Sequence, residues 1–114
     1  MEFIFLMLDG EVIRDWTQAQ QRDAVARMAE FTAPLRAAGV YRDSGGLGSD
    51  FGAARVRVTG GQASVVEGPF EGAQRVVGGF LVVECASRDE AIALAKRCPA
   101  AEWAPLEVRQ LWRH

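Results

Sequence analysis

The pattern of apolar residues along this chain predicts both strands and helices. Residues 3–8 form an unbroken apolar run that ends at an Asp-Gly pair, which predicts a short strand covered on both faces. A similar run over residues 77–85 predicts a second buried strand, and alternation over residues 106–112 predicts a closing one. Apolar side chains recur every three or four residues from Ala24 to Ala38, so we expect a helix there with one face toward a core.

Both predicted helices carry end signals. Thr-Gln-Ala-Gln at 17–20 has the spacing of a capping box, and Gly39 is a typical helix terminator. Ser-Arg-Asp-Glu at 87–90 is a second capping box, and Pro99 ends that helix. Pro34 lies inside the first helix, where it removes a backbone hydrogen bond, so we expect that helix to bend.

The order of elements predicts the fold class. Residues 55–58 and 63–66 flank a Gly-Gly pair that supplies the positive φ of a two-residue hairpin turn, and a strand over residues 40–47 fades into a glycine-rich loop. The order is therefore βα, then β with a hairpin, then βα, then β. This order favours a ferredoxin-like α+β sandwich in a single domain over residues 1–114, with a mainly antiparallel sheet and two helices on one face.

The central strands are apolar on both faces. If Ile4, Leu6 and Leu8 meet the helices, the alternation of side chains turns Phe3 and Phe5 to the opposite face. Two helices on one face leave the other face bare, and that much apolar surface is unusual on a monomer. We therefore expect a second copy, packed sheet to sheet, to form a homodimer with a space between the sheets.

Composition excludes several classes of partner. The 114 residues are 49% hydrophobic and 25% charged, as in an ordinary globular domain, and 13 Lys and Arg balance 15 Asp and Glu. Basic residues form no cluster, so we expect no direct contact with nucleic acid. No apolar run is long enough for a membrane span, and we expect no membrane association. The chain has no signal-like start and no Cys-x-x-Cys pair, which predicts a cytoplasmic protein with Cys85 and Cys98 reduced.

Metals and cofactors are equally unsupported by the sequence. The only histidine is His114, and the two cysteines are far apart, so we expect no metal. None of the glycine pairs opens a helix after a strand, as nucleotide-binding loops do, and we expect no cofactor.

Five short motifs follow one another at characteristic spacing. They are Glu-Gly-Pro-Phe at 67–70, Gly-Gly-Phe at 78–80, Ser-Arg-Asp-Glu-Ala at 87–91, Ala-Lys-Arg-Cys-Pro at 95–99 and Glu-Val-Arg at 107–109. In order and spacing they resemble the DGPF branch of the YCII-related family over essentially the whole chain. The resemblance implies a ferredoxin-like domain that dimerises into an α/β barrel. It also implies either a role beside extracytoplasmic-function sigma factors or an enzyme acting on small, often aromatic-derived compounds.

Glu67 is the candidate catalytic residue. The Gly-Pro pair that follows it turns the chain sharply and holds the carboxylate at a strand end, where a general acid or base could act. Acceptance of hydrogen bonds from its own turn is the structural alternative. Glu67 stands where the family usually has Asp. The histidine and carboxylate pair of relatives thought to be catalytic has no counterpart, because His114 is the only histidine.

The candidate binding residues are Arg55, Arg57, Arg109, Asp9 and Trp16. The arginines lie on predicted strands and could hold an anionic substrate, Arg109 above all, although solvated edge positions are the simpler explanation. Asp9 and Trp16 would line the mouth of a pocket, and an ordinary turn and an ordinary hydrophobic plug are the alternatives. We assign Trp103 and Trp112 to the edge of the dimer.

Two functions follow from these residues. The first is a dimeric module that binds a small molecule or acts as a regulator, with a sigma factor as one partner that the resemblance implies. The second is a cofactor-free enzyme in which Glu67 moves a proton, or drives an elimination, on a small cyclic anionic substrate held by Arg109. A single isolated carboxylate favours the first.

Overall fold

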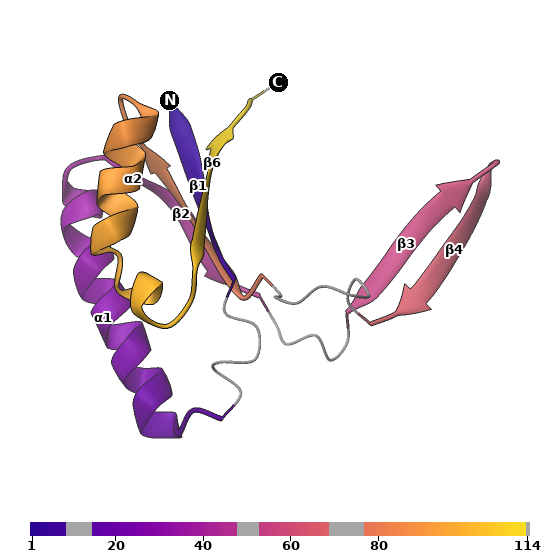
Figure 1. The fold of residues 1–114 in the computed structure, drawn as a ribbon, viewed down its shortest axis with the longest axis horizontal. Coiled ribbons are helices and arrows are strands. Elements are labelled where there is room, and N and C mark those ends of the chain that lie inside the picture. The colour runs from indigo at the N-terminus through magenta and orange to yellow at the C-terminus, as the bar shows by residue number, and fades with distance from the viewer. Residues whose placement is uncertain (9–14, 48–52, 69–76, 114) are drawn as a thin grey trace.

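Two helices cover one side of a four-stranded sheet, and a separate hairpin extends from the other side (Figure 1). The computed structural model describes residues 1–8, 15–47, 53–68 and 77–113. The elements are β1 (Glu2–Met7), α1 (Gln18–Ala37), β2 (Tyr41–Gly46), β3 (Ala54–Thr59), β4 (Gln62–Glu67), β5 (Gly79–Glu84), α2 (Arg88–Arg97), the 3₁₀ helix η1 (Pro99–Glu102) and β6 (Leu106–Leu111). No helix among the described residues is both long and apolar enough to cross a membrane.

The main sheet has the strand order β2-β5-β1-β6, and every neighbouring pair in it is antiparallel. Helix α1 connects β1 to β2, and β5 lies between these two strands in the sheet. Helix α2 connects β5 to β6, and β1 lies between them, so the two β-α-β units interlock. The ferredoxin-like α+β class predicted from the order of elements is confirmed, and the structure supplies the strand order that the sequence left open.

Local sequence signals start and end α1 as predicted. Thr17 Oγ1 accepts a hydrogen bond from the amide of Gln20 at 3.1 Å, and the Gln20 side chain accepts one from the amide of Thr17 at 2.8 Å. This pair confirms the capping box. Gly39, with φ of +74°, follows the last turn, where a β-carbon would be strained. The helix continues through Pro34 to Ala37 without a break.

The core lies between the helices and one face of the sheet. Its buried residues are Phe3, Phe5, Leu81, Val83, Cys85, Ala91, Leu94 and Ala95. Phe3 and Phe5 are 2% and 0% exposed, so the side of β1 that meets the helices is the opposite of the one assumed from the sequence. Alternation fixes which residues share a face, but it does not say which face meets the helices. The larger phenylalanine rings fill the space under the helices.

The other face of the sheet, which we name the open face, is also apolar at its centre. The strand register places Ile4 beside Val82 and Leu6 beside Phe80 on this face. Val82 is buried by its neighbours, and the other three are half-buried. None of the described helices packs over them (Figure 1). The predicted two-sided apolar character of the central strands is therefore present in the structure.

Strands β3 and β4 form a hairpin, residues 54–67, that we name the arm. Gly60 and Gly61 have φ of +59° and +78°, which confirms the predicted two-residue turn with two positive φ angles. Neither strand makes more than marginal contact with any other element of the described chain, and the arm stands apart in Figure 1. The sequence predicts the hairpin but not its separation from the sheet.

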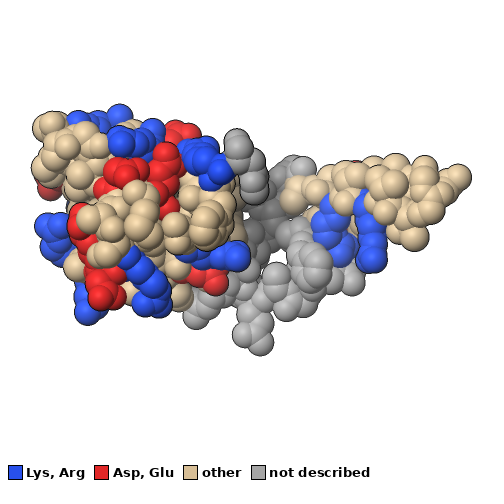
Figure 2. All heavy atoms as spheres, turned by 90° about the horizontal axis from the view of Figure 1, so that it is seen from above, with Lys and Arg blue, Asp and Glu red and all other residues tan. Residues whose placement is uncertain are grey.

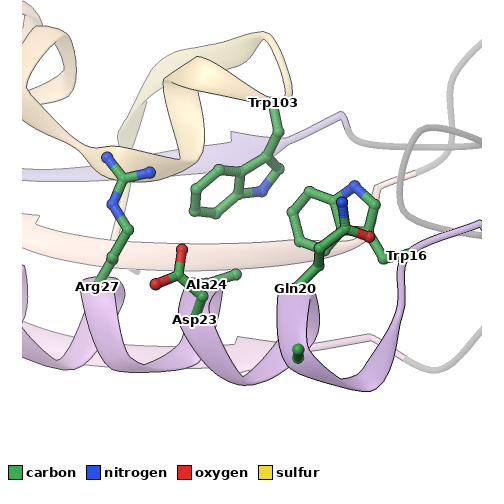
Figure 3. Close-up of a pocket in the computed structure, with 7 residues that line it drawn as sticks. Trp16, Gln20, Asp23, Ala24, Arg27 and Trp103 are labelled. Atoms are coloured by element: carbon green, nitrogen blue, oxygen red, sulfur yellow. The ribbon is translucent and has the colours of Figure 1, made fainter.

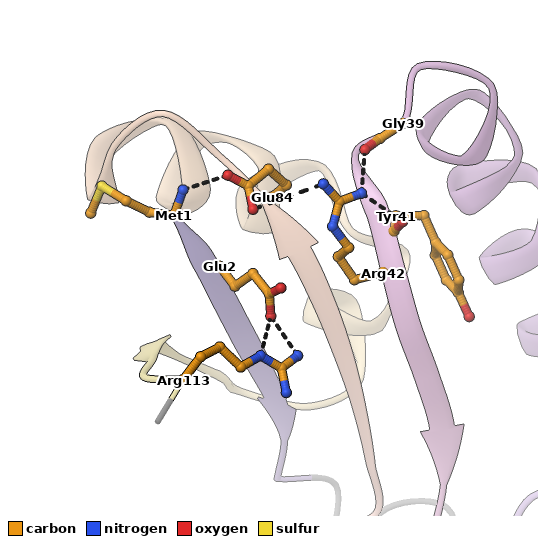
Figure 4. A network of polar contacts seen from close by, with 7 residues as sticks. All are labelled: Met1, Glu2, Gly39, Tyr41, Arg42, Glu84 and Arg113. Carbon is orange, nitrogen blue, oxygen red and sulfur yellow. Dashed lines mark hydrogen bonds and ion pairs between the residues drawn. The ribbon is translucent and has the colours of Figure 1, made fainter.

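A charged cluster closes one end of the open face (Figure 4). Glu2 and Glu84 are paired across β1 and β5. Arg113 donates to Glu2 at 2.6 Å, and the amino group of Met1 donates to Glu84 at 2.5 Å, with Arg42 at 4.0 Å from the same carboxylate. The hydrogen bond from the Met1 amino group and its positive charge lower the pKa of Glu84, and Arg42 adds to this effect.

Replacing a core phenylalanine should cost far more than replacing an exposed apolar residue. We expect Phe5→Ala to lower the free energy of unfolding by about 3–5 kcal/mol, because it removes a fully buried ring and leaves a cavity. Val25→Ala, on the exposed side of α1 at 70% exposure, is the control and should change it by less than about 0.5 kcal/mol. Urea unfolding curves measure both, and equal effects would contradict the described core.

The lowered pKa of Glu84 predicts a pH-dependent contribution to stability. Glu84→Gln should unfold at a lower temperature than the wild type near neutral pH, where the carboxylate is charged. The difference should shrink as the pH falls below the ordinary carboxyl value of 4.5 and through the lowered pKa, because the folded state then gains the proton too. Thermal unfolding at a series of pH values tests this, and a difference that does not depend on pH would disprove it.

Candidate functional site

Three of the residues singled out by the sequence lie on the arm. Arg55 and Arg57 occupy alternate positions of β3 and share one face, where the basic side chains lie side by side (Figure 2). Glu67 ends β4 and, by the strand register, lies on the opposite face with Val65 and Val56. Its side chain is exposed. The single chain therefore does not bring Glu67 together with the arm arginines.

The remaining predicted residues lie elsewhere. Arg109 is exposed on β6 and points to the open face, since it is paired with Ile4. Trp16 lies before α1, on the helix side of the sheet, and is one of the residues that line a cleft. Asp9 lies outside the described residues, as does His114. Of the predicted set, Trp16 alone is found in a described cavity.

The cleft lies between the first half of α1 and one end of the sheet, and its volume is about 550 Å³. Its lining residues are Met7, Trp16, Gln21, Ala24, Val25, Met28, Ser44, Gly45, Gly46, Gly78, Gly79, Phe80 and Trp103. The rings of Trp16 and Trp103 meet edge to face, with centroids 5.4 Å apart and planes at 74°. We name this cavity the tryptophan cleft. Its walls are mostly apolar, as is typical of small-molecule sites.

Glycines make the floor of the tryptophan cleft. Gly45 is paired with Phe80 across β2 and β5, so a β-carbon there would point to the open face, 2.9 Å from the Phe80 ring. A β-carbon at Gly79 would lie 3.1 Å from both Met7 Sδ and the carbonyl oxygen of Gly45. The missing side chain of Gly79 therefore lets β1, β2 and β5 approach closely at the floor of the cleft. Gly79, to which the sequence assigned no role, thus shapes the cavity.

A shallower hollow of about 410 Å³ adjoins the cleft and shares its two tryptophans (Figure 3). Asp23 and Arg27 line it from one face of α1, four residues apart. The Arg27 guanidinium lies 5.7 Å from the centre of the Trp103 ring and forms an ion pair with Glu102 of η1. This hollow thus combines the two tryptophans that it shares with the cleft with a carboxylate and a guanidinium.

This arrangement suits a flat, polar ring. Aromatic walls pack against ring faces and edges, a carboxylate accepts a proton, and a guanidinium stabilises an oxyanion. Cys98 packs behind the cleft, its sulfur 3.8 Å from that of Met28, but burial raises the pKa of its thiol. A protonated thiol is a poor nucleophile, so Cys98 is not a candidate for the reacting group. Within the described residues, no group of three or more His, Cys, Asp or Glu side chains could hold a metal ion.

Sequence reasoning missed Asp23, Arg27 and Trp103. Trp103 was assigned to a dimer edge, and Asp23 and Arg27 were given no role. The signal was present: Gln20, Asp23 and Arg27 recur at helical spacing one turn after Trp16, which places all of them on one side of the helix start. What the sequence lacks is the position of η1, which brings Trp103 over that face.

Comparison with known families decides the relationship of this chain. The family model of the YCII-related domain matches residues 1–114. The chain belongs to the YCII-related family. The family resemblance drawn from the five motifs is thereby confirmed, while its narrower assignment to the DGPF branch stays a prediction. No curated protein matched the chain in sequence.

A solved structure has a similar fold. The 5-chloro-2-hydroxyhydroquinone dehydrochlorinase TftG from Burkholderia phenoliruptrix AC1100, in complex with 2,5-dihydroxybenzoquinone, superposes with a TM-score of 0.57. The two sequences are 20% identical, and the alignment covers 100% of this chain and 95% of that chain. This likeness supports the ferredoxin-like fold of the YCII-related domain.

The tryptophan pair should give a spectroscopic signature. Two indoles held edge to face at 5.4 Å couple their excited states, so we expect a circular-dichroism couplet in the far ultraviolet. Trp16→Phe and Trp103→Phe should each abolish the couplet and lower stability by about 0.5–1.5 kcal/mol. Trp112→Phe is the control, because that side chain is 73% exposed. A couplet that survives either of the first two substitutions would contradict the described pair.

Proposed function

We propose that this YCII-related protein is a cofactor-free enzyme that moves protons on a small, flat, cyclic compound bound in the tryptophan cleft. The observation that carries the proposal is the hollow beside the cleft, where Asp23 and Arg27 line a cavity that shares the rings of Trp16 and Trp103 with the cleft. A volume of about 550 Å³ lies within the range of small-molecule pockets and has room for a single substituted ring.

The residues have separate roles in this proposal. The Asp23 carboxylate accepts a proton from a ring hydroxyl, and Arg27 stabilises the oxyanion that forms. The tryptophans hold the ring and exclude water from it. Glu102, which pairs with Arg27, keeps the guanidinium in the hollow beside the cleft. Glu67, the carboxylate favoured from the sequence, remains a second candidate for the base.

Elimination from a hydroxylated ring fits these groups. One hydroxyl proton moves to the ring carbon that bears a halide, a second is taken by the carboxylate, and the halide departs with its bonding electron pair. The ring becomes a quinone. Because the leaving halide carries away the electron pair, the reaction needs no external oxidant and no redox cofactor.

The comparisons support an enzyme more than a regulator. TftG, which shares the fold, is a dehydrochlorinase, and its structure contains a dihydroxybenzoquinone. Both names describe a flat ring with hydroxyl groups, the kind of compound that the tryptophan cleft suits. Nothing in the comparisons favours the regulatory module or a sigma-factor partner.

Binding and turnover should separate when Asp23 is neutralised. The probes are 2,5-dihydroxybenzoquinone, followed by quenching of tryptophan fluorescence, and 5-chloro-2-hydroxyhydroquinone, followed by chloride release. We expect Asp23→Asn to bind the quinone within about threefold of wild type and to lose about 10²- to 10⁴-fold in kcat, the usual contribution of a general base. Trp103→Ala should weaken binding itself.

Asp89→Asn, an exposed acid in the first turn of α2, is the matched control and should leave both measurements unchanged. Loss of turnover in Glu67→Gln with full turnover in Asp23→Asn would move the base to Glu67 and reject the role of Asp23. Quinone binding by the wild type without turnover of any hydroxylated ring would reject the enzyme and leave a binding module.

A further inference from the structure

A pair of hydroxyl groups lies where the edge strand β2 borders the tryptophan cleft. Ser44 of β2 lines the cleft, and of the described residues around this cavity it alone carries a hydroxyl group. Its Oγ lies 2.6 Å from the phenol oxygen of Tyr41, within the range of an O–H···O hydrogen bond. The proton transfer proposed above uses neither residue. The cleft therefore contains a polar group whose contribution to the site is still open.

A bulge in β2 brings the two hydroxyls to one face of the sheet. Residues 41 and 44 are three apart, so their side chains would lie on opposite faces of a regular strand. Here the register with β5 shifts across Arg42, so that Tyr41 is paired with Val83. Ser44 is paired with Leu81, two residues away on the same face of β5. Leu81 and Val83 are both buried under the helices, so both hydroxyls lie on the side of the cleft. Bulges commonly re-aim side chains next to functional sites.

A positive charge above Tyr41 sets the direction of the hydrogen bond. The guanidinium of Arg36 lies 3.8 Å from the centre of the Tyr41 ring, which is a cation–π contact. This charge draws electron density away from the phenol oxygen, so Tyr41 becomes a better donor and a poorer acceptor. Tyr41 therefore donates to Ser44. The O–H of Ser44 is then left to donate to a molecule bound in the cleft.

The two sets of polar groups lie on either side of the tryptophans. Asp23 and Arg27 line the hollow but not the cleft, whereas Ser44 lines the cleft but not the hollow. Trp16 and Trp103 line both cavities. A flat ring held by the tryptophans would therefore have a carboxylate and a guanidinium at one end and an O–H donor at the other.

We propose that Ser44 is a specificity residue of the tryptophan cleft and selects a ring with oxygen atoms at opposite ends. Its hydroxyl donates to the ring oxygen that lies away from Asp23, and Tyr41 is a positioning residue that acts through Ser44. The inference rests on the proposed function, because it takes the ring to bind between the tryptophans. It concerns recognition and not proton transfer. It narrows the ligand from any small, flat, cyclic compound to a ring oxygenated at both ends.

Two isomers test the selectivity. Hydroquinone carries its hydroxyls at opposite ends of the ring, whereas catechol carries them on adjacent carbons. In titrations followed by quenching of tryptophan fluorescence, we expect the wild type to bind hydroquinone about fivefold to tenfold more tightly than catechol, the contribution of one hydrogen bond. Ser44→Ala should weaken hydroquinone binding until the two affinities agree within about twofold.

Two further serine variants control this result. Ser44→Thr keeps the hydroxyl and should restore most of the preference for hydroquinone. Ser64→Ala removes an exposed serine of the arm and should leave the preference unchanged.

A double-mutant cycle separates positioning from a structural role. Tyr41→Phe keeps the ring that contacts Arg36 but removes the phenol hydroxyl, and it should lower the preference for hydroquinone about threefold. In the Ser44→Ala background the same substitution should change binding by less than about 1.5-fold, because Tyr41 acts through Ser44. A structural defect would instead weaken both isomers equally in both backgrounds.

Three outcomes would overturn the inference. The first is a wild type that binds neither isomer or binds both equally. The second is a preference for hydroquinone that survives Ser44→Ala. The third is an effect of Tyr41→Phe that is the same with and without the Ser44 hydroxyl, which rejects the positioning role.

Chloride release from 5-chloro-2-hydroxyhydroquinone distinguishes failure of this inference from failure of the proposed function. Turnover by the wild type, together with an isomer preference that does not depend on Ser44, rejects the specificity residue and keeps the enzyme. A preference that is lost in Ser44→Ala, without turnover by the wild type, rejects the enzyme and keeps the recognition site.

Discussion

Pairing of β1 with a neighbour on each side is the interaction on which the rest of the molecule depends. Both neighbours, β5 and β6, come from the second half of the chain, so β1 has partners on both sides only after about 105 residues have been placed. That pairing brings Phe3 and Phe5 beside Leu81 and Val83 and creates the surface that the helices cover. It also brings the Met7 end of β1 against the glycines that floor the tryptophan cleft.

Local signals in the sequence are strong enough to predict the elements but not how they face one another. The Thr17 capping box and the Gly-Gly turn of the arm depend on contacts within four residues, and both predictions are confirmed. The face of β1 that meets the helices depends on side-chain volume across three elements. Here the assumed choice of Ile4 and Leu6 was wrong, because alternation carries no information about which side is covered.

The sequence indicates only the part of the candidate site that depends on residues close together in the chain. Trp16 lies just before a helix that the sequence predicts, and its place in a cleft follows from that helix. Asp23 and Arg27 become part of the site through a contact with Trp103, which lies about 80 residues further along the chain. The spacing of apolar and polar residues along the sequence carries no information about a contact between residues so far apart. The roles given to Glu67 and to the three strand arginines concern groups that the single chain holds apart, so they stay predictions.

The glycine floor of the tryptophan cleft limits how this site can change. A cavity bounded by side chains is widened or narrowed by trading one for another, but a methyl group at Gly79 would crowd the carbonyl oxygen of Gly45 and the sulfur of Met7, both 3.1 Å away. Variation in ligand preference must therefore enter around this floor, above all through the roof of the cleft, at Trp16 and Trp103. A laboratory library that aims to change the ligand would do best to diversify the roof and leave the strand glycines untouched.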